Sequence, residues 1–473
     1  MKNKVHLFDL LRVKHETVTR IILFVIKAIS ITVMPITVIP ISKILNIAIR
    51  IKGKLYPGTL ILRILISVIL ITLIPIATTS CRHSADWIMF RGRNGRGATS
   101  NSLHPPLGLK WKLRLGLGEN ESIVFNPPIV KGGIIYFGSA DGNFYALDIK
   151  SGYMRWVFKT KGIINSIPYA DEQRVYFGSN DGRVYAVSLE EGRQVWSFQT
   201  ESTVQSNIVR YQDSVVFTSD AGATYFLTPE GVLKHRLPNP VWHYDTFQFS
   251  ENVMYFAPGP IQRPYSLGAY DLEQKSYLWI LNTAAIGATW YSFPALSSRL
   301  LFLGTCRNRT GLWNLGYYAY ERYTGTLIWS ERDESYFGNR VYQDPEELFR
   351  KNLRLLDYMA PSLWRNLVIF SSGDSVVRAF NAKRGTLVWR HVFEHPTSSA
   401  PTVAGNRIYF GLHGDEQFPG GEKPRLVCLA ARNGKKLWEL ELEGAILSAP
   451  VISGKWLIFG TDKNLFYVLE ELY

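Results

Sequence analysis

Acidic residues recur at a fixed phase in this sequence, and carboxylates spaced in this way are the first candidates for acid–base or metal chemistry. Asp141 and Asp181 lie 40 residues apart, and each stands directly before a glycine. An Asp-Gly pair between two β-rich runs is typical of a tight turn, in which the aspartate side chain bonds to its own backbone. Turn chemistry accounts for both carboxylates, so we expect neither a metal ligand nor a catalytic residue among them.

Serine recurs at a second fixed place, the opening of a β-rich run, at Ser166, Ser206, Ser292, Ser399 and Ser448. A serine nucleophile needs a neighbouring base, and no His-Asp pairing recurs with these serines. Crowding where repeats meet explains a small residue there, and we expect no catalytic serine.

The thiols outside the N-terminal region are Cys306 and Cys428, which stand in unrelated repeats. Cys428 takes a strand position that Ala146 and Ala186 fill elsewhere, which predicts a small buried apolar residue. Two such thiols do not form a disulfide framework.

The elements that carry these residues are short β-rich runs, four to a repeat. Residues 126–158 and 166–198 share Tyr-Phe-Gly-Ser, Asp-Gly, Tyr-Ala and a late Trp in the same order. Four short strands separated by turn residues make one propeller blade. Further units follow with decay at about 206–237, to Trp279, to Trp329, and at 361–389 and 401–438. The recurring tryptophans are expected to pack blades together.

The last unit, 448–469, holds three runs and lacks the Trp strand. A matching strand occurs at the other end, at 109–115 with Trp111. Pairing the two would close a ring and hide its free edges. Seven complete units and one shared unit predict an all-β, eight-bladed propeller over residues 108–473.

The repeat, with Ala-x-Asp/Ser, Gly and Trp at fixed places, resembles the pyrroloquinoline-quinone (PQQ)-like propellers over roughly residues 108–473. Residues 86–97 resemble a Trp-x-x-Phe-Arg-Gly-x-x-Gly-x-Gly segment that precedes many exported members, and packing against the propeller is the favoured role. Quinone-dependent dehydrogenases with these repeats use a calcium site, a base and, in many cases, two adjacent cysteines. This sequence has no adjacent cysteine pair, no haem Cys-x-x-Cys-His motif and no clear calcium set. We therefore expect no cofactor and no enzymatic activity.

Basic residues are concentrated near the N-terminus. Of the net charge of +14, residues 1–80 carry +9 (11 Lys and Arg against 2 Asp and Glu), and the remaining +5 is spread over nearly 400 residues. No basic stripe marks the propeller, so nucleic acid is excluded as a partner.

The hydrophobic region 1–80 predicts export. An apolar run at 64–76 follows basic residues and leads to Ala-Thr-Thr-Ser before Cys81. The segment resembles a bacterial lipoprotein signal, in which Cys81 would carry lipid; an uncleaved anchor is the alternative. Either way a linker, 81–107, would tether the propeller to a membrane outside the cytoplasm. Residues 1–50 are a further membrane segment or the result of a start codon placed too far upstream.

Insertions fall on one face of the predicted ring. With strands A to D counted outward from the axis, the B–C and D–A loops share a face. The departures from the repeat are the B–C loops 257–268, 305–316 and 412–425 and the D–A insertion 330–358. The last predicts a helix capped by Asp344 with an apolar stripe at Phe349, Leu353 and Leu356, either a packed lid or a docking element.

Aromatic residues gather on two neighbouring D–A loops of that face. The predicted partner or ligand face comprises Trp242, His243, Tyr244, Asp245, Trp290 and Tyr291. Such residues suit a protein hot spot or stacking on a sugar, and they could equally plug the central channel.

The plan of an exported, lipid-anchored propeller without cofactor residues resembles the lipoproteins of the outer-membrane β-barrel assembly machinery, which are non-catalytic scaffolds. The first hypothesis is therefore a membrane-tethered, protein-binding scaffold of the bacterial cell envelope, with a membrane protein as partner. The second is a propeller that binds envelope carbohydrate or another small ligand. The third, least favoured, is a quinone-dependent oxidoreductase.

Overall fold

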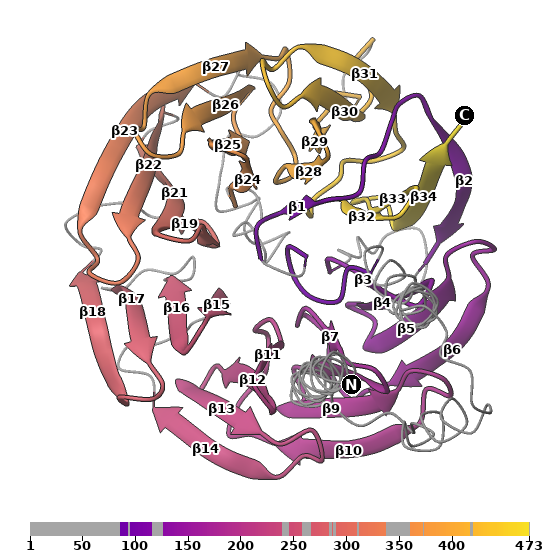
Figure 1. The fold of residues 1–473 in the computed structure, drawn as a ribbon. Coiled ribbons are helices and arrows are strands. Elements are labelled where there is room, and N and C mark those ends of the chain that lie inside the picture. The colour runs from indigo at the N-terminus through magenta and orange to yellow at the C-terminus, as the bar shows by residue number, and fades with distance from the viewer. Residues whose placement is uncertain are drawn as a thin grey trace, which may run out of the picture. The chain divides into compact units, whose positions relative to one another are not determined.

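The computed structural model describes residues 86–92, 95–115, 126–238, 246–257, 266–282, 286, 290–309, 312–336, 360–371, 373–416 and 420–472. They belong to one compact unit and form eight β-sheets arranged around a central axis (Figure 1). The predicted all-β, eight-bladed propeller is confirmed. The hydrophobic region 1–80 and Cys81 lie outside the described residues. Where the structure describes the chain, it contains no helical segment with the length and apolar character that a membrane span requires.

Blades 1 to 7 each consist of consecutive strands, named A to D from the axis outward. Blade 1 consists of β3 (Ile129–Lys131), β4 (Ile134–Gly138), β5 (Asn143–Asp148) and β6 (Met154–Lys159), and blade 2 consists of β7 (Tyr169–Ala170), β8 (Arg174–Gly178), β9 (Arg183–Ser188) and β10 (Gln194–Gln199). Blade 3 consists of β11 (Val209–Tyr211), β12 (Ser214–Ser219), β13 (Ala223–Leu227) and β14 (Leu233–Pro238). Blade 4 consists of β15 (Thr246–Ser250), β16 (Val253–Ala257), β17 (Ser266–Asp271) and β18 (Ser276–Asn282).

Blades 5 to 7 follow the same order, and blade 5 has a broken strand A. They are formed by β19 (Trp290–Tyr291) with β20 (Ala295–Leu296), β21 (Leu300–Arg309), β22 (Leu312–Glu321), β23 (Leu327–Tyr336); β24 (Ser362–Trp364), β25 (Leu367–Ser371), β26 (Val376–Asn381), β27 (Leu387–Val392); and β28 (Thr402–Ala404), β29 (Arg407–Leu412), β30 (Arg425–Ala430), β31 (Lys436–Glu441). A short N-terminal strand, β1 (Ala98–Thr99), joins blade 7 beside β28.

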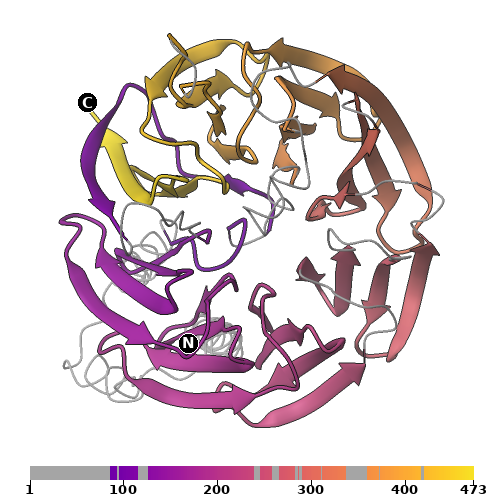
Figure 2. The same cartoon turned by 180° about the vertical axis from the view of Figure 1, so that it is seen from behind.

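Blade 8 closes the ring with strands from both ends of the described chain. The last three strands, β32 (Val451–Ser453), β33 (Trp456–Gly460) and β34 (Leu465–Glu471), are completed by β2 (Leu107–Arg114). The pairing of β2 with β34 is antiparallel and runs from Leu107 opposite Glu471 to Arg114 opposite Leu465. Both views show β2 as the outer strand beside β34 (Figures 1 and 2). The predicted closure is confirmed.

The core lies between adjacent blades. Strands B and C are buried on both faces, as in β8, where four of the five residues are buried, while the outer strand β6 alternates between exposed and half-buried residues. Aromatic residues fill the interfaces: the Phe144 and Phe177 rings of blades 1 and 2 stack with centroids 3.9 Å apart. Short strands rich in Tyr, Phe and Val suit this arrangement because bulky flat side chains cover much area on a pleated surface.

Tryptophans of strand D join six of the eight blades to the next one. Trp329 donates its Nε1–H to the carbonyl of Ala382 at 2.9 Å, and its indole lies against Gly385 of blade 6. An equivalent hydrogen bond to a backbone carbonyl, and an equivalent contact with a glycine of the next blade, are made by Trp111, Trp156, Trp196, Trp279 and Trp389. A register shift in the C–D pairing beside each of these tryptophans re-aims the strand, as β-bulges do. The predicted packing role of the tryptophans is confirmed.

Blade 5 corrects one expectation. Residues 305–316 were expected to form a loop, yet β21 and β22 continue as paired strands from Leu300 opposite Glu321 to Arg309 opposite Leu312. Strand β23 extends with them to Tyr336, so the first part of the 330–358 insertion is also strand. Cross-strand pairing satisfies the backbone groups that a loop would leave to water, which favours the longer hairpin. The predicted helix at 344–356 lies outside the described residues.

Candidate functional site

The central axis is crossed by the segment with the Trp-x-x-Phe-Arg-Gly-x-x-Gly-x-Gly pattern, here called the strap (residues 86–92 and 95–99). It begins at Trp87, which forms a two-way bridge with Val130 of blade 1. The carbonyl of Ile88 then accepts the N–H of Ala170 in blade 2. The strap ends in β1, which pairs with β28 of blade 7. The indigo trace inside the ring in Figure 1 shows this crossing, and these contacts agree with the expected packing of the segment.

Two strap side chains fill the axis. The Phe90 ring meets that of Phe293 edge-on, with centroids 4.7 Å apart. Phe90 belongs to an apolar cluster whose other members open the inner strands of five blades, namely Ile167, Phe293, Ala360, Ala400 and Ala449. A cluster drawn from five blades must lie at their common centre. Arg91, next in sequence, is only 2% exposed.

The Arg91 guanidinium binds blades 6 and 7 together. Its Nη2 donates to the carbonyl of Pro361 at 2.8 Å and to Ser362 Oγ at 2.8 Å, and its Nη1 donates to the carbonyl of Pro401 at 3.1 Å. Hydrogen bonds from a charged donor to buried carbonyls are strong, because water does not compete for those carbonyls. A Cβ at Gly97 would collide with this guanidinium. That close approach gives the last glycine of the pattern a physical reason, and it makes the strap a structural element.

The recurring serines and aspartates have structural partners. Ser166 Oγ donates to the carbonyl of Gly178 at 2.8 Å and accepts its N–H at 2.6 Å, which pins strand A to strand B. Ser206, Ser292 and Ser399 accept the backbone N–H groups of Thr218, Gly304 and Gly411 in the same way. Asp181 accepts the N–H of Arg183 and the hydroxyl of Tyr185. The turn role predicted for Asp181 is confirmed. The serines, for which only crowding was expected, also hold strand A to strand B through hydrogen bonds.

Neither described thiol is linked to another. Cys306 and Cys428 are free and buried. Burial raises the pKa of Cys428 to about 12, and burial likewise raises that of Cys306. Both are therefore protonated at neutral pH and behave as small apolar residues, as the sequence predicts for Cys428.

Two of the predicted face residues belong to the described part of the face that carries the B–C and D–A loops, here called the loop face. Trp290 and Tyr291 form β19, which pairs with Cys306 and Thr305 in the extended part of β21. They therefore belong to the longest sheet of the propeller. The other predicted face residues, Trp242, His243, Tyr244 and Asp245, and most of the B–C loop 257–268 lie outside the described residues.

A buried ionic group supports the extended sheet of blade 5. Arg378 in β26 takes the place that Tyr185 holds in blade 2, four residues after the turn aspartate. Its guanidinium donates two hydrogen bonds to the carboxylate of Asp374, which is fully buried. Its Nη2 also lies 2.7 Å from Asp333 Oδ2 of β23. No repeat position or motif in the sequence indicates this group. The i,i+4 spacing of Asp374 and Arg378 was its only local signal.

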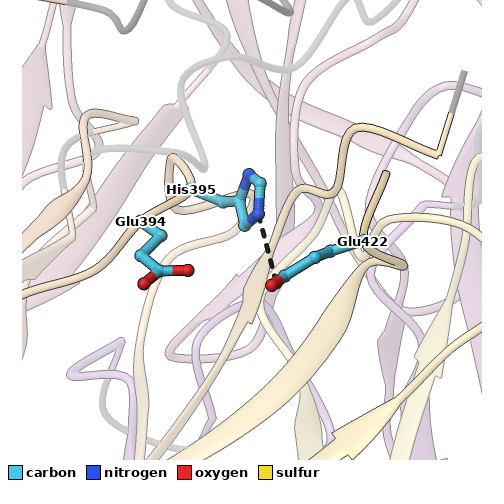
Figure 3. Close-up of side chains that lie close together, drawn as sticks. All are labelled: Glu394, His395 and Glu422. Carbon is cyan, nitrogen blue, oxygen red and sulfur yellow. Dashed lines mark hydrogen bonds and ion pairs between the residues drawn. The ribbon is translucent and has the colours of Figure 1, made fainter. Parts of the chain in front are cut away.

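A second cluster on the loop face joins blade 7 to the loop that precedes it. Glu394 and His395 lie between β27 and β28, and Glu422 lies between β29 and β30. His395 Nε2 is 3.2 Å from Glu422 Oε2, and one ligand atom from each of the three side chains lies within 4.8 Å of the others. Figure 3 shows the three side chains directed toward one space. The sequence predicts no metal site, and this group forms no local motif, because His395 and Glu422 are 27 residues apart.

The family model described as outer membrane protein assembly factor BamB matches residues 108–233, 264–416 and 373–472. These matches cover most of the propeller and more than half of the chain. The chain belongs to the BamB family. No curated protein matches it.

Solved structures place this BamB-family propeller in a wide fold group. BamB from Moraxella catarrhalis aligns with a TM-score of 0.53 at 14% identity, over 77% of this chain and 99% of that one. Quinohemoprotein alcohol dehydrogenase ADHIIG from Pseudomonas putida HK5 aligns with a TM-score of 0.60 at 16% identity, over 82% and 80%. The enzyme of that class from Comamonas testosteroni gives 0.58 at 14%, over 82% and 81%. At these identities the likeness is one of fold.

A quinone with its calcium ion does not fit the described axis of this BamB-family chain. Calcium takes six to eight oxygen ligands, with carboxylates prominent among them. The described inner strands β3, β7, β11, β15, β19, β20, β24, β28 and β32 contain no Asp or Glu. The space at their openings is taken by Phe90, and the Arg91 guanidinium is bonded to backbone carbonyls.

Proposed function

We propose that this chain is a non-catalytic, membrane-tethered scaffold of the bacterial cell envelope, which binds a membrane protein partner in outer-membrane protein assembly. The family match supports the assembly role, since the matching model is described as an outer-membrane protein assembly factor. The filled axis carries the non-catalytic part, because the strap places Phe90 and Arg91 where the blades converge. A propeller whose centre is closed offers its loops and edges for binding.

The loop face is the proposed contact surface. It carries the extended sheet of blade 5 and the backbone of Trp290 and Tyr291, and Tyr244 is assigned to it by the sequence. Aromatic residues at an interface centre combine large contact area with few rotatable bonds. The truncation of one such anchor costs about 2 kcal/mol or more, which corresponds to roughly a 30-fold loss of affinity.

A pull-down with the full chain tests this function. The tagged protein is retained from detergent-solubilised membranes and compared with a Trp290→Ala, Tyr244→Ala variant. The matched control is Tyr153→Ala, which removes an aromatic ring that is 76% exposed on the C–D turn of blade 1, on the opposite face. We expect a membrane protein that is enriched by the wild type and the control and lost with the double variant.

Three results would contradict the proposal. Equal retention by all three proteins would remove the loop face as the contact surface. Retention of no protein, together with calcium-dependent reduction of a dye after addition of the quinone, would establish an enzyme instead. A glycan that raises the melting temperature, again with no protein retained, would establish the carbohydrate-binding alternative.

The tether is proposed at Cys81. Lipid on this thiol would hold the chain to the membrane and leave the propeller free on the far side of the linker. Metabolic labelling with a radioactive fatty acid should mark the wild type and not a Cys81→Ser variant. Membrane association without any label would instead indicate an uncleaved anchor in residues 1–80.

A further inference from the structure

Two loops from different parts of the chain bring three potential metal ligands together on the loop face. The loop 393–401 enters blade 7 from β27 and carries Glu394 and His395, and the loop 413–424 joins β29 to β30 and carries Glu422. The imidazole Nε2 of His395 is 3.2 Å from Glu422 Oε2. The Glu394 carboxylate faces the same space from the other side (Figure 3).

Backbone contacts set these loops beside each other. The N–H of His413 donates to the carbonyl of Pro396 at 2.9 Å, one residue after His395. Thr397 forms an isolated bridge with Leu412. Because these bonds join the two loops directly, the separation of His395 and Glu422 follows from the fold and not from the side-chain rotamers alone.

The position of Glu422 is also fixed from within its own loop. Its N–H donates to Asp415 Oδ1 at 2.6 Å, and its carbonyl accepts the N–H of Asp415 at 2.9 Å. Arg425 Nη2 lies 2.8 Å from Glu422 Oε2. Carboxylates that bind metals are commonly held by an outer hydrogen-bond partner, which orients them before the ion arrives. Arg425 occupies that place here.

The ligand chemistry favours zinc over the other common divalent ions. One imidazole nitrogen with two carboxylate oxygens matches the mixed N/O sets that hold Zn²⁺, whereas Ca²⁺ and Mg²⁺ take oxygen ligands only. Tetrahedral bonds of 2.0–2.1 Å place neighbouring ligand atoms about 3.4 Å apart, close to the 3.2 Å between His395 and Glu422. Glu394 is exposed, and one of its carboxylate oxygens lies within 4.8 Å of the ligand atoms of His395 and Glu422.

From this convergence of Glu394, His395 and Glu422 we propose that the loop face binds one Zn²⁺ ion, with a water molecule as fourth ligand. The His395 side chain is 16% exposed and that of Glu422 is 39% exposed, so the space is open to an ion from solvent and partly shielded by protein. Bound zinc clamps the 393–401 loop to the 413–424 loop. The proposal concerns a site in blade 7 and does not depend on the partner that the scaffold binds.

Zinc titration of the full chain tests this site. Purified, chelator-treated protein in detergent competes with a chromophoric chelator for Zn²⁺, and Co²⁺ provides a second readout through its visible absorption when coordinated. We expect one ion per chain. His395→Gln and Glu422→Gln should each weaken binding by at least about 100-fold, because loss of outer-shell partners alone costs about 10–100-fold. Excess Ca²⁺ or Mg²⁺ should leave the signal unchanged.

The matched control is His104→Gln, since His104 pairs with Glu471 at 3.0 Å on the surface, and no third ligand joins that pair among the described residues. Zinc affinity should be unchanged in this variant. The proposal is overturned if the wild type binds no stoichiometric zinc, or if His395→Gln and His104→Gln bind it as the wild type does. Metal-free circular dichroism of each variant verifies that it is folded, so that loss of binding reports the site. An intact fold with no zinc would leave His395, Glu422 and Arg425 as an ion-pair network.

Discussion

Replacement of Gly385 by alanine tests how the blades are joined. Gly385 adopts a φ of +74°, and an added Cβ would lie 2.7 Å from Cγ and Cδ2 of the Trp329 indole. A left-handed backbone costs an L-residue about 1–2 kcal/mol. Overpacking against a ring that is fixed by its bond to Ala382 adds about 1–3 kcal/mol. We therefore expect Gly385→Ala to lower the free energy of unfolding by about 2–5 kcal/mol.

A second glycine separates the two contributions. Gly222 has a φ of +82° with no atom within 4 Å of the Cβ that alanine would add, so Gly222→Ala carries the backbone cost alone, about 1–2 kcal/mol. Urea unfolding of the full chain, followed by circular dichroism, gives the midpoints. Trp329→Phe should reduce the cost of Gly385→Ala toward that of Gly222→Ala, because the smaller ring leaves room. Equal midpoints for Gly385→Ala and Gly222→Ala would refute the claim that the indole–glycine contact holds blades 5 and 6 together.

Three further outcomes follow from buried groups. Arg91→Met should lower the free energy of unfolding by about 3 kcal/mol in urea titration, because it removes the charged donors from buried carbonyls. Arg378→Met should cost about 3–5 kcal/mol in the same assay at pH 7, since it leaves the fully buried Asp374 without its cation. Cys306 and Cys428 should resist maleimide at pH 8 in the folded chain and react after unfolding, as read by mass spectrometry, because burial raises both thiol pKa values.

Controls for these outcomes come from the chain itself. Arg155 pairs with Asp148 on the surface, where its side chain is 59% exposed, so Arg155→Met should cost less than about 1 kcal/mol. A cost for Arg91→Met or Arg378→Met no larger than this would contradict the role given to the buried arginine. Arg378→Tyr should be milder than Arg378→Met, because tyrosine at the same place in blade 2 bonds to Asp181. Rapid labelling of either described thiol in the folded chain would contradict its burial.

The repeat pattern predicted the blades, and the reason is that each blade is built from local contacts. Strands B and C of blade 1 are joined by a turn of a few residues, so Asp141 and the glycine after it define that turn without help from distant residues. The tryptophans could be assigned to packing for the same reason, because one contact recurs in six of the eight blades. Trp111 stands alone at the N-terminal end, and its place in blade 8 could be predicted only because the last unit lacked that strand.

Insertions and long-range contacts could not be predicted in this way. The 305–316 segment interrupts the repeat, and an interruption does not show whether it is a loop or, as in β21 and β22, a longer hairpin. Arg91 meets the carbonyl of Pro401 across 310 positions of sequence, and no local pattern in the strap indicates its acceptors. The strap could be recognised as a motif, while its role in filling the axis required the ring.

The sequence by itself determined the number of blades, the strand that closes the ring and the structural role of the repeated Asp, Ser and Trp residues, because those features repeat and depend on neighbours within one or two blades. Tertiary structure alone decided what fills the axis and which side chains meet on the loop face. His395 and Glu422 have no signal as a pair in the sequence, since their contact arises from two loops that the closed ring brings together. Ring closure converts separations along the chain into contacts, and that step depends on the packing of all eight blades.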